Sequence, residues 1–212
     1  MVQLRPYLAR LLALLATGLA SAAAAQSDNG LYAPVPDPES SFVRVIAPGA
    51  SVATVDQVAI DQFDQGVTPY INVDPGQVGV SSDGQTVDVS IAQRSYYTVV
   101  VGADGAVSTL SDEITSSPAK ADLMFYNLSD IETADLFVPQ AKANALTGVE
   151  AGSAQSVALK APLTLDFEVQ AEGETIATIP AVELRRREGV TLVVLGSGGD
   201  YSAFYQNNSY RY

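Results

Sequence analysis

The sequence contains no cysteine and no histidine among its 212 residues. Without cysteine there is no disulfide, no thiolate nucleophile and no cysteine to carry a lipid anchor. Without histidine there is no Ser-His-Asp triad, no imidazole base and no ordinary zinc site. These two absences exclude most hydrolytic machinery. They leave carboxylate chemistry, a Ser-Lys arrangement, or a cation bound by oxygen atoms.

Basic residues are scarce as well. The chain has 11 Lys and Arg against 24 Asp and Glu, which gives a formal net charge of −13. Nucleic acid binding needs clustered Lys and Arg, so this composition argues against a nucleic acid partner.

Neither a metal site nor a cofactor site is predicted. Asp56, Asp61 and Asp64 lack the spacing and the glycine of a calcium loop, so we expect solvated loop carboxylates. The glycine-rich residues 196–200 resemble a phosphate loop, but neither a helical pattern nor a lysine follows them. We interpret this segment as a flexible turn.

Residues 1–25 have the layout of a secretory signal peptide. A basic start with Arg5 and Arg10 precedes an apolar run at 11–16 and a small-residue end at 23–25, so cleavage is expected before Gln26. The alternative is an N-terminal membrane anchor, but the apolar run is shorter than the roughly 20 residues that span a bilayer. We therefore expect an exported protein whose net charge changes from −13 to −15 on loss of the two arginines.

Short β-strand patterns fill the rest of the chain. Residues 94–102 form a β-branched and aromatic run that ends in glycine, and residues 188–196 repeat this form. The alternation in the first run places Tyr97, Val99 and Val101 on one face of a strand and the intervening residues on the other. In the same way, Arg44 is expected to point away from its neighbours Val43 and Val45.

The repeat predicts an all-β fold with two tandem antiparallel β-sandwich domains. In the second unit, Gly148 and Gly152 are expected to mark turns between strands. The predicted boundaries are a signal peptide at 1–25, an extended arm at 26–40, domain 1 at 41–111, a linker at 112–120, and domain 2 with an aromatic tail at 121–212.

Three surface features are candidate partner contacts: Leu31 and Tyr32 in the proline-containing arm, the basic run Arg185, Arg186 and Arg187, and the tail tyrosines Tyr201 and Tyr205. The basic run suits an acidic partner or polymer, and aromatic residues among amides suit protein or sugar contact. Each feature also has a structural explanation. The arm can pack on domain 1, the arginines can form a solvated turn, and the tail can cover its own edge strand.

Five short segments in order resemble the AlgF family, the periplasmic accessory proteins of alginate O-acetylation. They are Leu-Tyr-Ala-Pro at 31–34, Ser-Phe-Val-Arg-Val at 41–45, Ser-Tyr-Tyr-Thr-Val at 95–99, Asn-Leu-Ser-Asp at 127–130, and Arg-Glu-Gly-Val at 187–190. The resemblance implies a non-catalytic periplasmic protein of two β-sandwich domains. It also implies partners: soluble periplasmic acetyltransferase proteins of the pathway and a membrane O-acyltransferase.

The composition agrees with a non-catalytic role, because no residues for a usual acetyl-transfer site are present. A uronic acid polymer is anionic, so we expect weak or no direct polysaccharide binding by so acidic a chain. Two other functions stay open. One is a covalent acetyl carrier in which a serine works with Lys120, Lys142 or Lys160. The other is a carbohydrate-binding or matrix-structural module.

Overall fold

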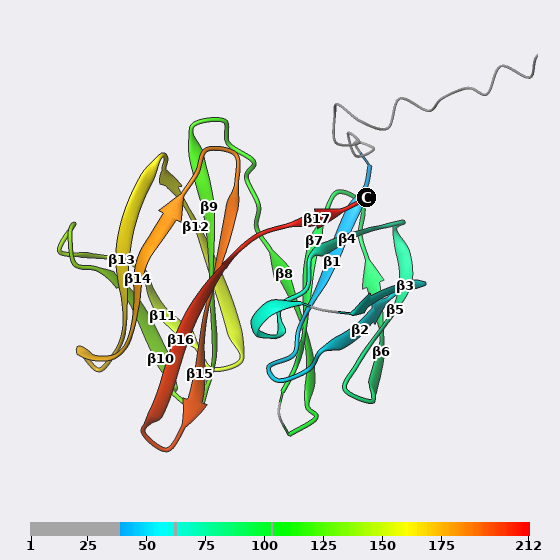
Figure 1. Ribbon diagram of the computed structural model, residues 1–212, viewed down its shortest axis with the longest axis horizontal. Helices are drawn as coiled ribbons and strands as arrows, with labels where there is room; N and C mark the ends of the chain where they lie inside the picture. Colours follow the sequence, from blue (N-terminus) through cyan, green and yellow to red (C-terminus); the bar gives the residue numbers. More distant parts are fainter. Residues whose placement is uncertain (1–38, 62, 103) are drawn as a thin grey trace, which may run out of the picture. The chain divides into compact units, whose positions relative to one another are not determined.

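The computed structural model describes residues 39–61, 63–102 and 104–212, and its fold is all-β, as the sequence predicts (Figure 1). The expected signal peptide and the arm residues Leu31 and Tyr32 lie outside the described residues. The described part contains one 3-10 turn at Asp64–Gly66. Within that part of the chain, no helix has the length and apolarity needed to cross a membrane.

The first eight strands and the last one form two sheets. Sheet A has five strands in the order β17-β4-β1-β7-β8, and sheet B has four in the order β3-β2-β5-β6. The bounds are β1 Ser41–Ile46, β2 Val52–Val55, β3 Val58–Asp61, β4 Tyr70–Val73, β5 Gly76–Ser82, β6 Gln85–Ile91, β7 Tyr96–Val101, β8 Val107–Asp112 and β17 Tyr210–Arg211. We call sheets A and B the first sandwich.

The remaining strands form sheets C and D, the second sandwich. Sheet C has the order β12-β9-β15-β16, and sheet D has the order β11-β10-β13-β14. The bounds are β9 Lys120–Ser129, β10 Thr133–Val138, β11 Ala143–Glu150, β12 Ser153–Lys160, β13 Leu163–Ala171, β14 Glu174–Leu184, β15 Gly189–Ser197 and β16 Asp200–Asn207.

Most neighbouring strands are antiparallel, as predicted, but three pairs are parallel. These are β1 with β7, β9 with β15, and β17 with β4. In the first two pairs the chain leaves one strand, builds other strands, and returns in the same direction beside its starting point. Such a return needs a long connection, and a two-residue hairpin cannot provide it.

The distinctive run at Tyr96–Val101 is an interior strand, β7, and its predicted faces are confirmed. Tyr97, Val99 and Val101 pack into the core between sheets A and B. Val100 points the other way and packs with residues of the second sandwich, including Met124 and Val193. The second sandwich has its own core between sheets C and D, built around side chains such as Phe167.

The outward faces of sheets A and C therefore contact each other. A third apolar cluster there combines Ile46, Val67 and Val100 with Met124, Tyr126 and Val193. All six residues of β1 are buried, because one face meets sheet B and the other meets sheet C. This contact makes the two sandwiches neighbours through their central strands.

One segment differs from the sequence-based expectation. Gly148 lies inside β11, whereas a turn was predicted there. The pairing of β10 and β11 shifts register around this region, and Gly148 has a positive φ of 65°. A β-bulge explains the mistake, because a bulge uses glycine in a left-handed conformation without ending the strand. The tail forms β16 and β17, which belong to different sheets.

Candidate functional site

The most unusual side chain of the structure is Arg44, a charged residue only 1% exposed. The alternation of β1 turns it away from Val43 and Val45, as predicted, and toward sheet C. Its guanidinium uses all five N–H groups. The bonds are Nε to Thr98 Oγ1 at 2.9 Å, Nη1 to Thr191 Oγ1 at 2.6 Å and Asn208 Oδ1 at 3.1 Å, and Nη2 to Tyr126 OH at 2.8 Å and Met124 Sδ at 3.9 Å.

The opposite charge is supplied by Asp112, the buried last residue of β8. Its carboxylate accepts hydrogen bonds from Tyr70 OH at 2.7 Å, from Thr98 Oγ1 at 2.6 Å, and from Tyr126 OH. The hydroxyls of Thr98 and Tyr126 each accept from Arg44 and donate to Asp112. Two hydroxyl groups thus link the buried cation to the buried anion. We call Arg44, Tyr70, Thr98, Asp112, Tyr126, Thr191 and Asn208 the Arg44 cluster.

Aromatic rings complete the surroundings of the guanidinium. The Arg44 Cζ atom lies 4.3 Å from the centre of the Tyr70 ring and 5.3 Å from that of Tyr126. Burial opposes the charge of Arg44, but Tyr126, Tyr70 and Asp112 outweigh it and leave the pKa above its usual value. Burial also raises the pKa of the Tyr70 and Tyr126 hydroxyls, so both stay neutral and act as hydrogen-bond donors.

This geometry indicates that the Arg44 cluster holds the two sandwiches together. Arg44, Tyr70, Thr98 and Asp112 come from sheet A, whereas Tyr126 and Thr191 come from sheet C. Every donor of Arg44 is already occupied, so none remains for a substrate. The cluster joins the sandwiches by directional bonds in addition to the apolar contacts around it.

A pocket of about 290 Å³ lies beside the cluster and is lined by Asp112, Met124 and residues of β8 and β12. It contains serines at 111 and 156 but no lysine. Within the described chain, no serine hydroxyl hydrogen-bonds to Lys120, Lys142 or Lys160, the lysines of the open acetyl-carrier alternative. The described residues also hold no group of three acidic side chains placed to bind a metal, and Asp56, Asp61 and Asp64 are each exposed.

The aromatic tail adds a second link between the sandwiches. After β16 in sheet C, the chain crosses to sheet A, where β17 pairs in parallel with β4 (Figure 1). The Tyr210 ring stacks on Tyr70, with 5.4 Å between ring centres and 16° between planes. Phe42 and Tyr96 pack edge-on against Tyr210. Burial raises the pKa of Tyr210. The last residues of the chain thus extend the Arg44 cluster with an aromatic layer.

The candidate tyrosines of β16 have structural contacts. Tyr201 OH donates to Asp130 Oδ1 at 2.8 Å, and the Gly198 N–H donates to Asp130 Oδ2 at 2.8 Å. These bonds, led by the one from Gly198, lower the pKa of Asp130. They also hold the turn predicted at 196–200. Tyr205 is half-buried and packs against the core of the second sandwich.

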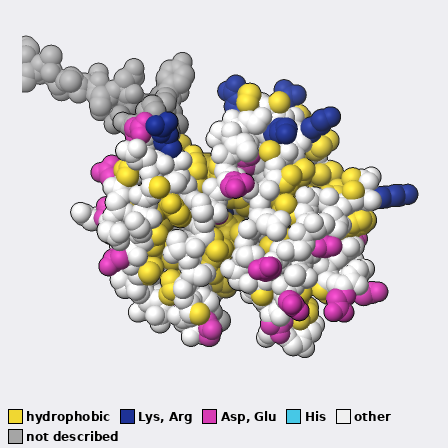
Figure 2. Space-filling view, turned by 180° about the vertical axis from the view of Figure 1, so that it is seen from behind, with side chains coloured by type: hydrophobic (Ala, Val, Ile, Leu, Met, Phe, Trp, Pro, Cys, Tyr) yellow, Lys and Arg dark blue, Asp and Glu magenta, His cyan; other side chains and the backbone are white. Residues whose placement is uncertain are grey.

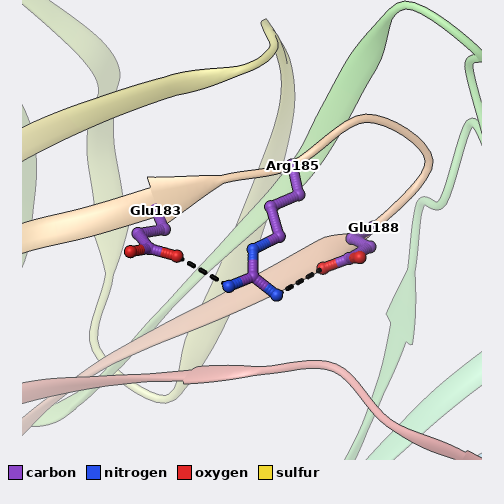
Figure 3. Close-up of polar contacts among 3 residues, drawn as sticks. All are labelled: Glu183, Arg185 and Glu188. Atoms are coloured by element: carbon purple, nitrogen blue, oxygen red, sulfur yellow. Dashed lines mark hydrogen bonds and ion pairs between the residues drawn. The ribbon is translucent and has the colours of Figure 1, made fainter.

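The three candidate arginines occupy the turn between β14 and β15. Arg185 lies between two glutamates, with Nη2 2.8 Å from Glu183 Oε2 and Nη1 4.0 Å from Glu188 Oε2 (Figure 3). Arg186 Nε donates to the Ala161 carbonyl oxygen at 2.9 Å. The Arg187 backbone N–H donates to the Lys120 carbonyl oxygen at 3.0 Å, while its side chain is exposed.

Strand register brings two lysines close to these arginines, although they are distant from them in the sequence. Lys120 and Lys160 are partners in the pairing of β9 and β12, at the end of the sandwich that holds the β14–β15 turn. Both are exposed. We call Lys120, Lys160, Arg185, Arg186 and Arg187 the basic end. The residues come from three separate stretches of sequence, so only the strand pairing reveals the cluster.

Comparison with known proteins identifies the family. The family described as "Alginate O-acetyl transferase AlgF" matches residues 14–192. The chain is 30% identical over 203 residues to the "Alginate biosynthesis protein AlgF" of Pseudomonas fluorescens, covering 92% of this chain and 91% of that protein. It is 26% identical over 188 residues to the protein of the same name from Pseudomonas syringae pv. tomato, covering 87% and 84%.

A solved structure is also similar: the C-terminal domain of AlgF from P. aeruginosa. That chain is 23% identical and has a TM-score of 0.38, and the match covers 42% of this chain and 99% of that one. The family match extends over most of the sequence, and the curated relatives match at nearly full length. The chain therefore belongs to the AlgF family.

Proposed function

We propose that this protein is a non-catalytic periplasmic adaptor required for O-acetylation of alginate or a similar exopolysaccharide. The observation that carries the proposal is the Arg44 cluster. In this cluster every N–H group of the Arg44 guanidinium donates a hydrogen bond within the protein. These bonds connect the first sandwich to the second, which comes from a distant part of the chain. A body fastened in this way supports a role in presenting binding surfaces at fixed positions.

The partners we propose are enzymes of the acetylation pathway. The family description and the relatives' names associate the family with alginate biosynthesis and O-acetyl transfer. The chain carries a net charge of −13, which disfavours long-range attraction of a uronic acid polymer. A soluble periplasmic acetyltransferase is therefore the preferred partner, and a membrane O-acyltransferase is the second.

Deletion of the gene in the producing strain tests this function. The strain is expected to secrete the polymer without its O-acetyl groups, and a plasmid copy of the full chain should restore them. Acetyl content is measured by proton NMR of the purified polymer. A polymer with normal acetyl content in the deletion strain would contradict the proposed function.

A covalent acetyl carrier is distinguished from an adaptor by mass spectrometry. Purified protein is incubated with an activated acetyl ester and its intact mass is measured. An adaptor should show no acetyl adduct on serine. A stoichiometric serine adduct, lost when that serine is replaced by alanine, would support the carrier instead.

A further inference from the structure

We propose that the basic end of the second sandwich is the docking surface for an acidic, partly apolar surface of a protein partner. This inference rests on the adaptor function proposed above and names the surface that performs it. It adds Lys120, Lys160 and Leu163 to the arginines that the sequence points to.

The first support is the concentration of positive charge. Within the described residues, the side chains of Lys120, Lys160 and Arg187 form no ion pair, and all three are exposed. Their carboxylate neighbours at this end are Glu183 and Glu188, which both face Arg185. The buried Asp122 is occupied by Thr115 and Ser116. A positive surface on a chain of net charge −13 is suited to attract acidic groups.

The second support is an exposed apolar side chain within this surface. Leu163 begins β13, is 47% exposed, and pairs with Leu184, the residue before Arg185. Pro162, next to it, is also exposed. Figure 2 shows hydrophobic atoms between the dark blue side chains at this end of the second sandwich, in the right-hand half of the view. An apolar centre with charged residues around it is the usual anatomy of a protein interface.

The third support is the way Arg185 is held. Glu183 and Glu188 lie on either side of its two terminal nitrogens and favour one orientation of the guanidinium, while the side chain stays 58% exposed (Figure 3). A pre-oriented arginine loses less rotamer freedom when it binds a carboxylate. Arginine is also enriched among the residues that dominate binding energy at protein interfaces.

The second sandwich is polarised along its strands. Its opposite end carries the exposed acids Asp130, Glu132, Glu150 and Asp200, and the stretches around them contain no Lys or Arg. The ends are separated by the length of β15, nine residues or about 30 Å. In Figure 2, acidic side chains lie toward the other end from the basic group. Opposite charges at the two ends favour one orientation of an approaching acidic partner and disfavour the reverse.

A protein partner fits this surface better than the polysaccharide. A uronic acid chain repeats one negative charge per sugar and has no apolar side chain to pack against Leu163. An acidic protein surface with one apolar side chain complements both the positive charge of the basic end and the exposed Leu163. Polysaccharide binding is therefore the competing outcome of the test.

The test compares two charge-reversed forms of the full exported chain. The surface variant is Lys160→Glu with Arg187→Glu, and the control is Arg94→Glu with Arg211→Glu, two exposed arginines of the first sandwich. Both change the net charge equally at exposed residues, and both should keep the wild-type circular dichroism spectrum. Binding to a purified soluble periplasmic acetyltransferase of the producing strain is measured by surface plasmon resonance at two salt concentrations.

The surface variant should associate at least about tenfold more slowly at low salt, with a weaker dependence on salt, whereas the control should change less than about threefold. Leu163→Asp should weaken binding further by speeding dissociation. Equal loss in both double variants, or none in either, would overturn the surface while leaving the adaptor function intact. Wild-type protein that binds alginate oligosaccharides through this end, and not the acetyltransferase, would overturn both.

Discussion

Replacing Arg44 by methionine should be among the most damaging single changes in the protein. The substitution keeps an unbranched chain of similar length but removes the guanidinium, which is 1% exposed. It leaves Asp112 as a buried carboxylate with no compensating cation, and it leaves the oxygens of Thr98, Thr191 and Tyr126 without their donor. Removing one of two buried opposite charges costs about 3–5 kcal/mol, because the other charge stays buried without compensation. We expect the free energy of unfolding to fall by that amount.

A double-mutant cycle between Arg44 and Asp112 should show that the two buried charges are coupled. Asp112→Asn should also destabilise, because it leaves the Arg44 charge buried without a partner. The double variant Arg44→Met with Asp112→Asn removes both charges, so its loss should be smaller than the sum of the single losses by about 2 kcal/mol or more. Arg94→Met is the control, because its ion pair with Glu39 is exposed and should be worth at most about 1 kcal/mol.

Urea unfolding followed by far-UV circular dichroism measures these free energies, with the midpoint and the slope fitted separately. A loss below about 1 kcal/mol for Arg44→Met would refute the fastening role of the cluster. Strict additivity in the cycle would refute the coupling of Arg44 to Asp112 through the two hydroxyls.

Three further predictions concern the tyrosines and the turns. Because burial raises the pKa of Tyr70 and Tyr126, part of the tyrosine absorbance change should be missing in native protein above pH 10 and appear on unfolding. The unfolded chain ionises first, so the contribution of these two tyrosines to stability should be constant below about pH 10 and fall as the pH rises further. A native titration complete near pH 10 would contradict their burial. Tyr210→Ala should lower the free energy of unfolding by about 2 kcal/mol or more, because the ring stacks within the aromatic layer. A decrease of only a few tenths of a kcal/mol would show that the tail does not hold the sandwiches together. Gly196→Ala should destabilise the protein by about 1–3 kcal/mol, because φ is 123° and an added Cβ would lie 2.0 Å from a backbone oxygen. Gly198→Ala has open space around the added Cβ and should cost less. Equal melting temperatures of the two variants would argue against this difference.

The faces of the strands could be predicted from the sequence because alternation is a local property. The assignment of Tyr97, Val99 and Val101 to one core followed from spacing alone and is confirmed. The direction of Arg44 followed from the same rule. What it points toward did not, because its partner Tyr126 lies 82 residues away and Asn208 lies 164 away. No local pattern encodes contacts at such separations.

For the candidate surfaces too, the sequence reveals residues that are adjacent in the chain but not those that strand pairing brings together. Arg185, Arg186 and Arg187 are adjacent in sequence and easily found. Lys120 and Lys160 join them through the pairing of β9 with β12, and Leu163 through that of β13 with β14. The sequence leaves open whether the aromatic tail contacts a partner or covers its own edge strand, and it does not predict that β17 crosses to the other sandwich. A short segment with few β-branched residues gives no signal for such a crossing.

The most direct test of the adaptor role is affinity purification from the periplasm of the producing strain. A tagged full chain, expressed from its own locus, is recovered under mild salt and the bound proteins are identified by mass spectrometry. We expect the wild-type chain to recover the soluble acetyltransferase of the same pathway in near-stoichiometric amount, and the Lys160→Glu with Arg187→Glu variant to recover much less. Recovery of no acetylation enzyme by the wild-type chain, in a strain whose polymer is normally acetylated, would contradict it.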